Sequence, residues 1–549
     1  MENNWTVAKQ IVEIMKREQI DRVFSVPGES FLDLMDEIYK DGSIDFVAAR
    51  HEGGASFMAE AYGKASKKPG VAAATRGVGA SNLAIGVHTA YQDSTPMVVF
   101  LGQVERQFRG REGFQEIELE QMFAPMTKWT YELTDPGRTN EMVSRAFRIA
   151  QSGRPGPVVI SLPADLLGEK SAYKELPGYQ VSRPFPEVNE INQAVELLQT
   201  AKRPLIVAGG GVLLSDAEAL LQRFAEKTNI PVLASFRRHD VIPNNHEQYV
   251  GHSGLGTLPA ILDTARQADV VLAIGTRFSE ITTQSYSLFS EQMTLLHIDI
   301  DPDTLGKVYP PDVGVTADAA KALTALLEST VQPKTEWKEW AKQRRNAYLE
   351  VTAIPDRPHP DTVDMQQIIR NMQNILPEDA IITNDAGNFS AWLHNYYQFH
   401  NAHTYIGPTS GAMGYGLPAA IAAKLARPEQ TVVSLSGDGG FMMTVQELET
   451  AKRENVPVIA LVFNNSMYGT IRMHQEKQFP GHVIGTSLAD IDFTGLAEAI
   501  GIRSERIKDD ASFADALKRA MEQKEPAVIE VICDPEKISV LSDLSDFHK

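Results

Sequence analysis

The sequence predicts an α/β protein with three doubly wound parallel-sheet domains, and two observations carry that prediction. Short apolar runs, typical of strands buried in parallel sheets, alternate along the chain with amphipathic stretches typical of helices. Two segments, at residues 166–188 and 335–360, interrupt this alternation and carry several prolines, which indicates linkers. We therefore expect domains at residues 1–165, 189–330 and 361–549.

Composition and charge exclude several classes of function. The chain has 549 residues, of which 43% are apolar, enough for several packed cores. A net charge of −19 argues against nucleic acid or an anionic membrane as a partner. Cys533 is the single cysteine, which excludes intrachain disulfides and a thiolate metal site. The N-terminus lacks the features of a signal peptide and no apolar run could span a bilayer, so we expect a soluble, cytoplasmic protein.

In the first segment, polar and glycine residues follow the expected strands directly. Pro27-Gly28 turns the chain after the first strand, and Arg50-His51-Glu52 follows the second. Open parallel sheets bind ligands at the carboxyl ends of their strands, so Gly28 and Glu52 are candidate site residues. The strands expected in this segment are 22–26, 46–49, 70–74, 97–101 and 158–162.

The pattern of the second segment predicts a further parallel sheet, and one of its motifs has two interpretations. Gly209-Gly210-Gly211 follows its first strand and is consistent either with a phosphate-binding turn or with a plain tight turn. The basic stretch 335–345 beyond this segment is interpreted as a solvated helix face in the linker. The expected strands are 204–208, 231–234, 269–274 and 295–300.

The third segment contains the strongest motif. A strand at 432–435 leads into Gly437-Asp438-Gly439-Gly440, and a second strand at 458–463 ends at Asn464-Asn465. A carboxylate, an amide oxygen and a loop carbonyl suit Mg²⁺ when a phosphate supplies the remaining ligands. The glycines allow backbone N–H groups to approach that phosphate. A helical stretch around residues 441–451 separates the two halves, and the Gly/Ala-rich stretch 411–422 is predicted to be a closely packed helix.

Gly-Asp-Gly followed at this distance by Asn-Asn resembles the diphosphate–metal motif of thiamine-diphosphate-dependent enzymes. The resemblance covers nearly the whole chain and implies a pyrimidine-binding domain, a middle Rossmann-like domain and a diphosphate-binding domain. It implies that Asp438, Asn465 and the carbonyl of Met467 bind Mg²⁺. Glu52 would hydrogen-bond the aminopyrimidine ring of the cofactor and promote formation of its nucleophilic carbon. Met413 would hold the cofactor in its bent form. The implied cofactor-binding set is Gly28, Glu52, Asn388, Met413, Gly437, Asp438, Gly439, Gly440, Asn465 and Met467.

Within that family, two motifs resemble the acetolactate synthase branch. They are Phe114-Gln115-Glu116 and Thr127-Lys128-Trp129, which imply that Gln115 and Lys128 lie near the substrate together with the catalytic Glu52. The implied function is a carboligase that decarboxylates a 2-oxo acid such as pyruvate and joins the acyl carbanion to a second carbonyl. Another thiamine-dependent decarboxylase, oxidase or acyltransferase is the alternative, and a non-catalytic binding homologue is a third reading.

Several features depart from that branch and leave specificity open. Arg76 stands where acetolactate synthases usually have serine, and His474 stands where the biosynthetic enzymes have tryptophan. The segment 251–254 differs from their flavin-contacting motif, whereas 275–278 matches it in outline, so bound FAD is possible. The resemblance also implies a homodimer or homotetramer, because Glu52 of one subunit would face Asp438 of another. The sequence does not identify the acceptor or a regulatory subunit.

Overall fold

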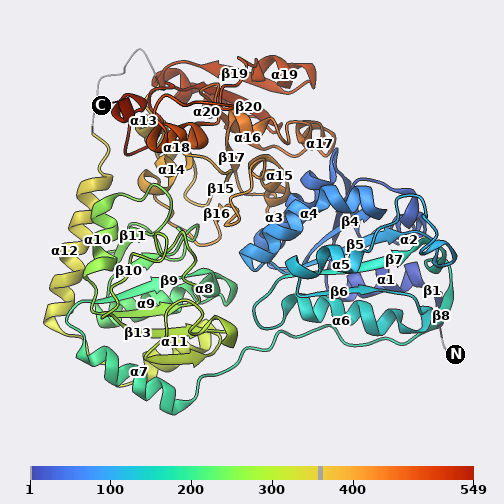
Figure 1. The fold of residues 1–549 in the computed structure, drawn as a ribbon, viewed down its shortest axis with the longest axis horizontal. Coiled ribbons are helices and arrows are strands. Elements are labelled where there is room, and N and C mark those ends of the chain that lie inside the picture. Colours follow the sequence, from blue (N-terminus) through green and yellow to red (C-terminus); the bar gives the residue numbers. More distant parts are fainter. Residues whose placement is uncertain (1–2, 356–362, 549) are drawn as a thin grey trace.

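The computed structural model describes residues 3–355 and 363–548 and contains three domains, each built on a six-stranded parallel sheet between helices (Figure 1). The first domain is blue to cyan in Figure 1, the second is green to yellow, and the third, orange to red, lies above both. The predicted α/β fold with three doubly wound sheets is therefore confirmed. No helix in the described ranges combines the length and the apolar character that a membrane span requires.

The first domain has the strand order β3-β2-β4-β5-β7-β6, with every pair parallel. Its strands are almost continuously apolar because helices cover both faces. The helix α1 (Val7–Arg17) begins where the Thr6 hydroxyl accepts the N–H of Lys9, and it packs Ile11 and Met15 into the core. The strands are β2 (Arg22–Ser25), β3 (Asp45–Ala48), β4 (Gly70–Thr75), β5 (Met97–Gln103), β6 (Trp129–Glu132) and β7 (Pro157–Pro163).

The third domain repeats this topology. Its order, β16-β15-β17-β18-β20-β19, matches that of the first domain when each set of strands is numbered from its own first strand. The two outer domains are therefore copies of one fold, as their alternation predicted. The strands are β15 (Ile381–Asn384), β16 (Tyr405–Ile406), β17 (Val432–Gly437), β18 (Ile459–Asn464), β19 (Arg503–Ile507) and β20 (Ala527–Ile532).

The middle domain has a different order, β11-β10-β9-β12-β13-β14. Numbered from its first strand this is 3-2-1-4-5-6, the order of dinucleotide-binding Rossmann domains, which reverses between its first and fourth strands. The strands are β9 (Pro204–Ala208), β10 (Val232–Ala234), β11 (Tyr249–His252), β12 (Val270–Ile274), β13 (Thr294–Asp299) and β14 (Val313–Thr316).

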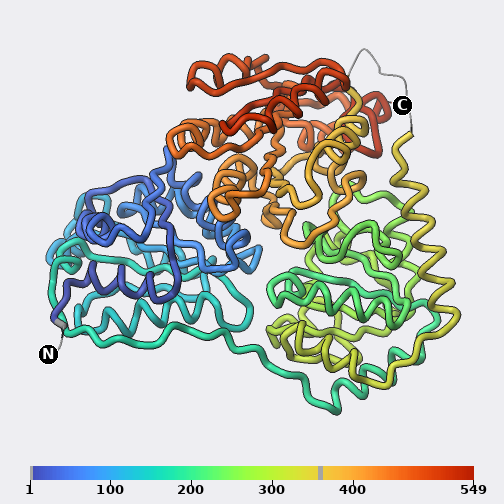
Figure 2. Tube along the Cα trace, turned by 180° about the vertical axis from the view of Figure 1, so that it is seen from behind, coloured from blue at the N-terminus to red at the C-terminus, as the bar shows by residue number. Residues whose placement is uncertain are grey.

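Two expected linkers contain ordered structure. The strand β1 (Asn3–Thr6) pairs antiparallel with β8 (Lys170–Tyr173), so the first domain continues to residue 173 and only the remaining segment is extended (Figure 2). The stretch 335–345 is not a linker but part of α12 (Thr335–Thr352), which packs on the middle domain. Trp337 and Trp340 are buried there, and their indole N–H groups donate to carbonyls beside β9. Of the three prolines in that second expected linker, Pro358 and Pro360 lie outside the described residues.

Three further differences concern two helices and an edge strand. The predicted helix at 411–422 begins only at Gly416, as α15 (Gly416–Ala426). Gly411 and Gly414 have φ of +69° and +80°, which no helix accommodates, so they form a turn before it. The expected single helix around 441–451 is split into α16 (Asp438–Phe441) and α17 (Glu447–Arg453). The edge strand β6 was not predicted, because its four half-buried residues have no distinct apolar run.

Candidate functional site

Parallel pairing brings the ends of β17 and β18 together in the third domain. Gly437 lies opposite Phe463, so Asp438 and Asn464-Asn465 emerge from neighbouring strands. Asp438 starts the short helix α16, and the loop after Asn465 is fixed by two backbone hydrogen bonds, from Tyr468 N–H to Thr486 and from Leu488 N–H to Ser466. The two predicted side-chain ligands therefore follow adjacent strands at one edge of the sheet.

The carboxylate of Asp438 is buried but only partly satisfied. The side chain is 5% exposed, and its Oδ1 accepts the N–H of Gly439 at 2.8 Å. Its Oδ2 is buried without a hydrogen-bond partner among the described residues. Burial raises the pKa of this carboxyl, and the N–H groups of the facing loop oppose that shift. A buried carboxylate oxygen without a donor is destabilising unless a cation compensates it, so the donor set fits Mg²⁺.

The other two expected ligands have free capacity for a cation. The described residues give the side-chain amide of Asn465 no hydrogen bond. The carbonyl oxygen of Met467 accepts the N–H of Gly469 at 3.0 Å, which leaves it one lone pair. The residue between them, Ser466, has φ of +54°, so the loop carrying these groups is held in an unusual backbone conformation.

The glycines of the motif are required by close packing. A Cβ at Gly439 would lie 2.5 Å from the ring of Tyr468. A Cβ at Gly440 would lie 2.6 Å from Oδ2 of Asp385, a carboxylate that also accepts the N–H of Gly414 at 3.0 Å. Burial raises the pKa of Asp385 to about 6. The backbone of this loop is therefore unobstructed by side chains of its own, as a phosphate-binding turn requires.

Two further predicted cofactor residues lie beside this loop. Met413 lies between two glycines of positive φ and is half-buried. Asn388 has its side chain occupied: its Oδ1 accepts from the hydroxyl of Thr470 at 3.0 Å, and its Nδ2 donates to the carbonyl of Ile538 at 2.9 Å. Asn388 therefore holds the surrounding loops together.

In the first domain, Glu52 is the first residue of α3 (Glu52–Ser66). The His51 ring accepts the N–H of Gly53 at 3.0 Å and caps this helix, so His51 is structural. Oε2 of Glu52 accepts from Nδ2 of Asn82 at 2.9 Å. Asn82 lies on α4 (Arg76–Asp93), and sequence reasoning missed it because nothing in its local pattern distinguishes it from a surface asparagine.

Gly28 and Gln115 lie near the same edge of the first sheet. A Cβ at Gly28 would lie 2.6 Å from Cβ of Thr75, the last residue of β4. The carbonyl of Gln115 accepts the N–H of Gly77. Two residues further on, a Cβ at Gly79 would lie 3.2 Å from Oε1 of Glu52. The structure thus brings Gly28, Glu52 and Gln115 to the carboxyl end of the sheet.

Lys128 is not part of this group. It precedes β6, at the amino end of the parallel strands, and its Nζ donates to the carbonyls of Ile149 and Ser152. Burial, reinforced by Arg154, lowers the pKa of Lys128 to about 8. The structure gives Lys128 a role in packing beside the middle domain and does not place it with Glu52 and Gln115.

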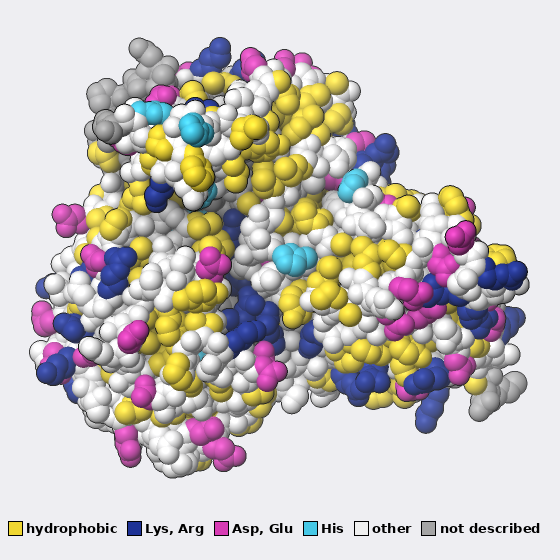
Figure 3. Space-filling view, viewed as in Figure 1, with side chains coloured by type: hydrophobic (Ala, Val, Ile, Leu, Met, Phe, Trp, Pro, Cys, Tyr) yellow, Lys and Arg dark blue, Asp and Glu magenta, His cyan; other side chains and the backbone are white. Residues whose placement is uncertain are grey.

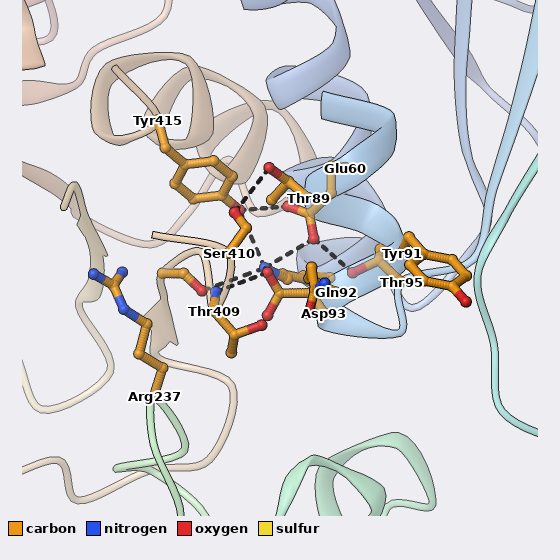
Figure 4. A network of polar contacts seen from close by, with 12 residues as sticks. Glu60, Thr89, Tyr91, Gln92, Asp93, Thr95, Arg237, Thr409, Ser410 and Tyr415 are labelled. Carbon is orange, nitrogen blue, oxygen red and sulfur yellow. Dashed lines mark hydrogen bonds and ion pairs between the residues drawn. The ribbon is translucent and has the colours of Figure 1, made fainter. Parts of the chain in front are cut away.

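The first and third domains of one chain meet through a buried polar network (Figure 4). Tyr415 donates from its hydroxyl to Glu60, and Lys64 lies 2.8 Å from Glu60 and 3.2 Å from Asp93. Asp93 also accepts the N–H of Thr409. This network joins α3 and α4 to the start of α15. Glu447 of α17 also accepts the N–H of Arg50, two residues before Glu52, but no hydrogen bond or ion pair among the described residues links Glu52 to Asp438.

A cavity of about 430 Å³ lies between the first and middle domains. It opens at the point where the middle sheet reverses its order, between β9 and β12, and a Cβ at Gly209 would lie 2.1 Å from the Gly275 carbonyl. Three arginines line it: Arg154, Arg238 and Arg277. Figure 3 shows Lys and Arg side chains gathered in the hollow between these domains. Burial raises the pKa of the lining Asp299 to about 6.

The middle and third domains meet through three buried histidines. His239 stacks on His394 with ring centroids 4.2 Å apart and meets His252 edge-on at 4.5 Å. Both ring nitrogens of His239 are buried without a partner among the described residues. Burial lowers the pKa of His252 to about 3, so these rings are neutral at physiological pH. His474, by contrast, is exposed on α18 (Gly469–Gln478).

Comparisons with known proteins agree with this arrangement. Three family models match in chain order: the thiamine pyrophosphate enzyme N-terminal TPP binding domain at residues 5–122, the central domain at 191–326 and the C-terminal TPP binding domain at 385–531. Each match contains most of the strands of one of the three sheets.

Similar full-length proteins carry one kind of name. A probable acetolactate synthase large subunit of Methanocaldococcus jannaschii is 32% identical over 96% of this chain and 92% of its own length. The acetolactate synthase large subunit of Corynebacterium glutamicum is 33% identical over 96% and 86%. The isozyme 3 large subunit of Escherichia coli is 32% identical over 94% and 92%. The chain therefore belongs to the thiamine pyrophosphate enzyme family and, within it, to the acetolactate synthase-like enzymes.

Proposed function

We propose that this protein is a carboligase that decarboxylates a 2-oxo acid such as pyruvate and joins the resulting two-carbon unit to a second carbonyl compound. The observation that carries the proposal is the buried Oδ2 of Asp438, which has no hydrogen-bond partner among the described residues and belongs to a glycine-rich loop. This is the environment that a Mg²⁺–diphosphate group would complete.

The residues of the third domain would hold the cofactor by its diphosphate. Asp438, Asn465 and the Met467 carbonyl would bind Mg²⁺, and Gly437, Gly439 and Gly440 would admit the phosphate oxygens to backbone N–H groups. Thiamine diphosphate, when bound, supplies a nucleophilic carbon that adds to a carbonyl and accepts the electrons released with CO₂. Met413 would hold the cofactor in its bent form.

Glu52 would act on the opposite end of the cofactor, by sharing a proton with a ring nitrogen. The 2.9 Å hydrogen bond from Asn82 to Oε2 fixes the carboxylate orientation and leaves Oε1 for that contact. Gln115, at the same edge of the sheet, would contact the substrate. Lys128 receives no catalytic role, because its ammonium group is held by backbone carbonyls elsewhere.

The active unit would be at least a homodimer, since no hydrogen bond or ion pair among the described residues links Glu52 to Asp438 within one chain. Large apolar side chains are exposed around both half-sites, which supports a second copy covering them. They are Val78, Ile85, Phe114 and Ile117 in the first domain, and Met442, Met443, Ile471 and Ile484 in the third. Sedimentation at assay concentration tests this, and an active monomer would contradict it.

The middle domain would bind a nucleotide, with FAD as the specific proposal. The Rossmann order, the glycines at the switch point and three arginines suit a diphosphate, and Asp299 at the end of β13 suits a ribose hydroxyl. The visible absorption spectrum of the purified protein tests for flavin. Release of an adenine nucleotide without flavin would confirm the pocket but contradict FAD.

Two further proposals concern a partner subunit and the location of the protein in the cell. The relatives are named large subunits, so a regulatory subunit is proposed for this chain also, and affinity purification from its own cells would reveal it. The proposed location is the cytoplasm, which fractionation would test.

The decisive experiment identifies products. The purified protein is incubated with thiamine diphosphate, Mg²⁺ and a panel of 2-oxo acids, with Glu52→Gln as the control. The carboligase proposal expects acetolactate from pyruvate. An aldehyde as the sole product would establish a simple decarboxylase, and acetyl phosphate formed in phosphate buffer would establish an acyltransferase.

A further inference from the structure

Arg76 occupies the switch point of the first sheet. The neighbouring strands β2 and β4 diverge there, because β3 lies on the other side of β2. Arg76 directly follows β4 as the first residue of α4, and Glu29 follows β2. Crevices at such points are where open α/β sheets bind ligands. Glu52 and Gln115 lie at the same edge of the sheet.

The backbone at Arg76 is strained. Its φ is +43°, in the left-handed region that a residue with a side chain rarely adopts. The next residue, Gly77, donates its N–H to the carbonyl of Gln115, which itself has φ of +64°. Glycine at position 76 would relieve this strain, yet the chain carries a long cationic side chain there. Such outliers concentrate at ligand-binding sites.

The guanidinium is held in place with one edge unused. Its Nη1 donates to Oε1 of Glu29 at 3.0 Å, and its Cζ lies 6.0 Å from the ring centre of Phe114. Nε is buried without a partner, and no described residue accepts from Nη2. The Nε–Nη2 edge matches a carboxylate in a two-point contact. The Arg76 side chain is 15% exposed, whereas that of Glu29 is 68% exposed and free to move away.

We propose that Arg76 selects the acceptor by binding its carboxylate, so that the second substrate is an anionic carbonyl compound. This rests on the proposed carboligase function. The donor is a poor partner for Arg76, because its carboxylate leaves as CO₂ and a cation that stabilises the bound carboxylate more than the transition state slows that loss. The acceptor keeps its carboxylate throughout. Glu29 occupies Arg76 until the acceptor anion displaces it.

The test compares two acceptors, 2-oxobutyrate and its methyl ester, which is uncharged and one methyl group larger, with pyruvate as donor. The measured quantity is the ratio of kcat/KM for the acid to kcat/KM for the ester. Arg76→Gln should lower this ratio about 10- to 100-fold, as expected for loss of a charge-assisted hydrogen bond. Glu29→Gln should raise it roughly threefold, because it removes an exposed competitor. Arg138→Gln, an exposed arginine of the same domain, is the control.

A lower ratio in Arg76→Gln together with a higher ratio in Glu29→Gln would distinguish acceptor selection by Arg76 from a purely structural role. An unchanged ratio in Arg76→Gln, or a fall in both variants, overturns the proposal. CO₂ release by the wild-type protein from pyruvate as the sole substrate tests the carboligase function on which this proposal rests. If that release is absent, the carboligase proposal fails and this one with it. If it is present with an unchanged ratio, only the role of Arg76 is refuted.

Discussion

The first and third domains share one strand order but differ in what stands at the ends of their strands. After the third strand of its sheet, the third domain has Asp438, a buried carboxylate with an unpaired oxygen in a glycine loop. At the same position the first domain has Arg76, a strained cation paired with an exposed glutamate. The same fold thus carries a carboxylate that suits a cation in the third domain. In the first domain it carries an arginine with a neighbouring glutamate.

This difference shows how a duplicated fold can divide the work of one site. The sheets set where polar groups emerge, and the residues just beyond the strands set what they bind. Neither copy carries both sets of groups, so under the proposed function each domain would supply one part of the site.

The strongest way to break the comparison is to remove the carboxylate of the third domain. Asp438→Ala should abolish measurable binding of thiamine diphosphate in the presence of Mg²⁺, because the diphosphate loses its cation bridge. Isothermal calorimetry checks this, with Asp515→Ala as the control at an exposed acid of the same domain. Wild-type affinity in Asp438→Ala would rule out the metal assignment.

The matching change in the first domain should separate binding from activity. Glu52→Gln is expected to bind the cofactor but to lose about 10²–10⁴-fold in turnover, the usual contribution of a positioned acid–base group. Asn82→Ala should lose less, since it only orients that carboxylate. Exchange of the reactive cofactor proton, followed by NMR, is the measurement. A wild-type exchange rate in Glu52→Gln would refute the role.

The buried network between the two copies should be a major source of stability. Lys64→Met leaves Glu60 without its cation and Asp93 with Arg238 alone, and loss of one partner in a buried ion pair costs about 3–5 kcal/mol. Thermal unfolding measures this against Lys40→Met, an exposed lysine of the first domain. Equal melting temperatures for the two variants would show that the network contributes little.

The first strand is followed by Val26 in the first domain and by Asp385 in the third. We expect this difference to have a smaller effect, on the pH dependence of stability. The pKa of Asp385 is raised to about 6 from 3.8, so the folded state holds its proton longer than the unfolded chain. Stability should therefore fall by about 2–3 kcal/mol as pH rises from 3.8 to 6, and then stay level. Asp385→Asn should lack that fall. Urea unfolding across this range, without cofactor, measures the slope, and parallel curves would contradict the prediction.

The sequence predicts the parts of this protein that local pattern encodes. Continuous apolar runs locate β17 and β18, and Asp438 and Asn465 follow from where those runs stop. Contacts between domains leave no local signal in the sequence. The hydroxyl groups of Thr89 and Ser410, for example, are hydrogen-bonded although the two residues lie 321 positions apart. The sequence alone predicts that Trp337 belongs to a basic surface helix, because its burial depends on contacts with the middle domain. Asn82 becomes recognisable only when its distance to Glu52 is known.

The unpaired oxygen of Asp438 also bears on the lifetime of the protein. A group that destabilises the empty fold makes any bound cation a stabiliser, by about 2.7 kcal/mol when the free ligand is 100 times its dissociation constant. Molecules that lack metal and cofactor unfold more often, and proteases remove unfolded chains. The supply of magnesium and thiamine would then govern how many copies of this protein a cell retains, and not only how many of them are loaded.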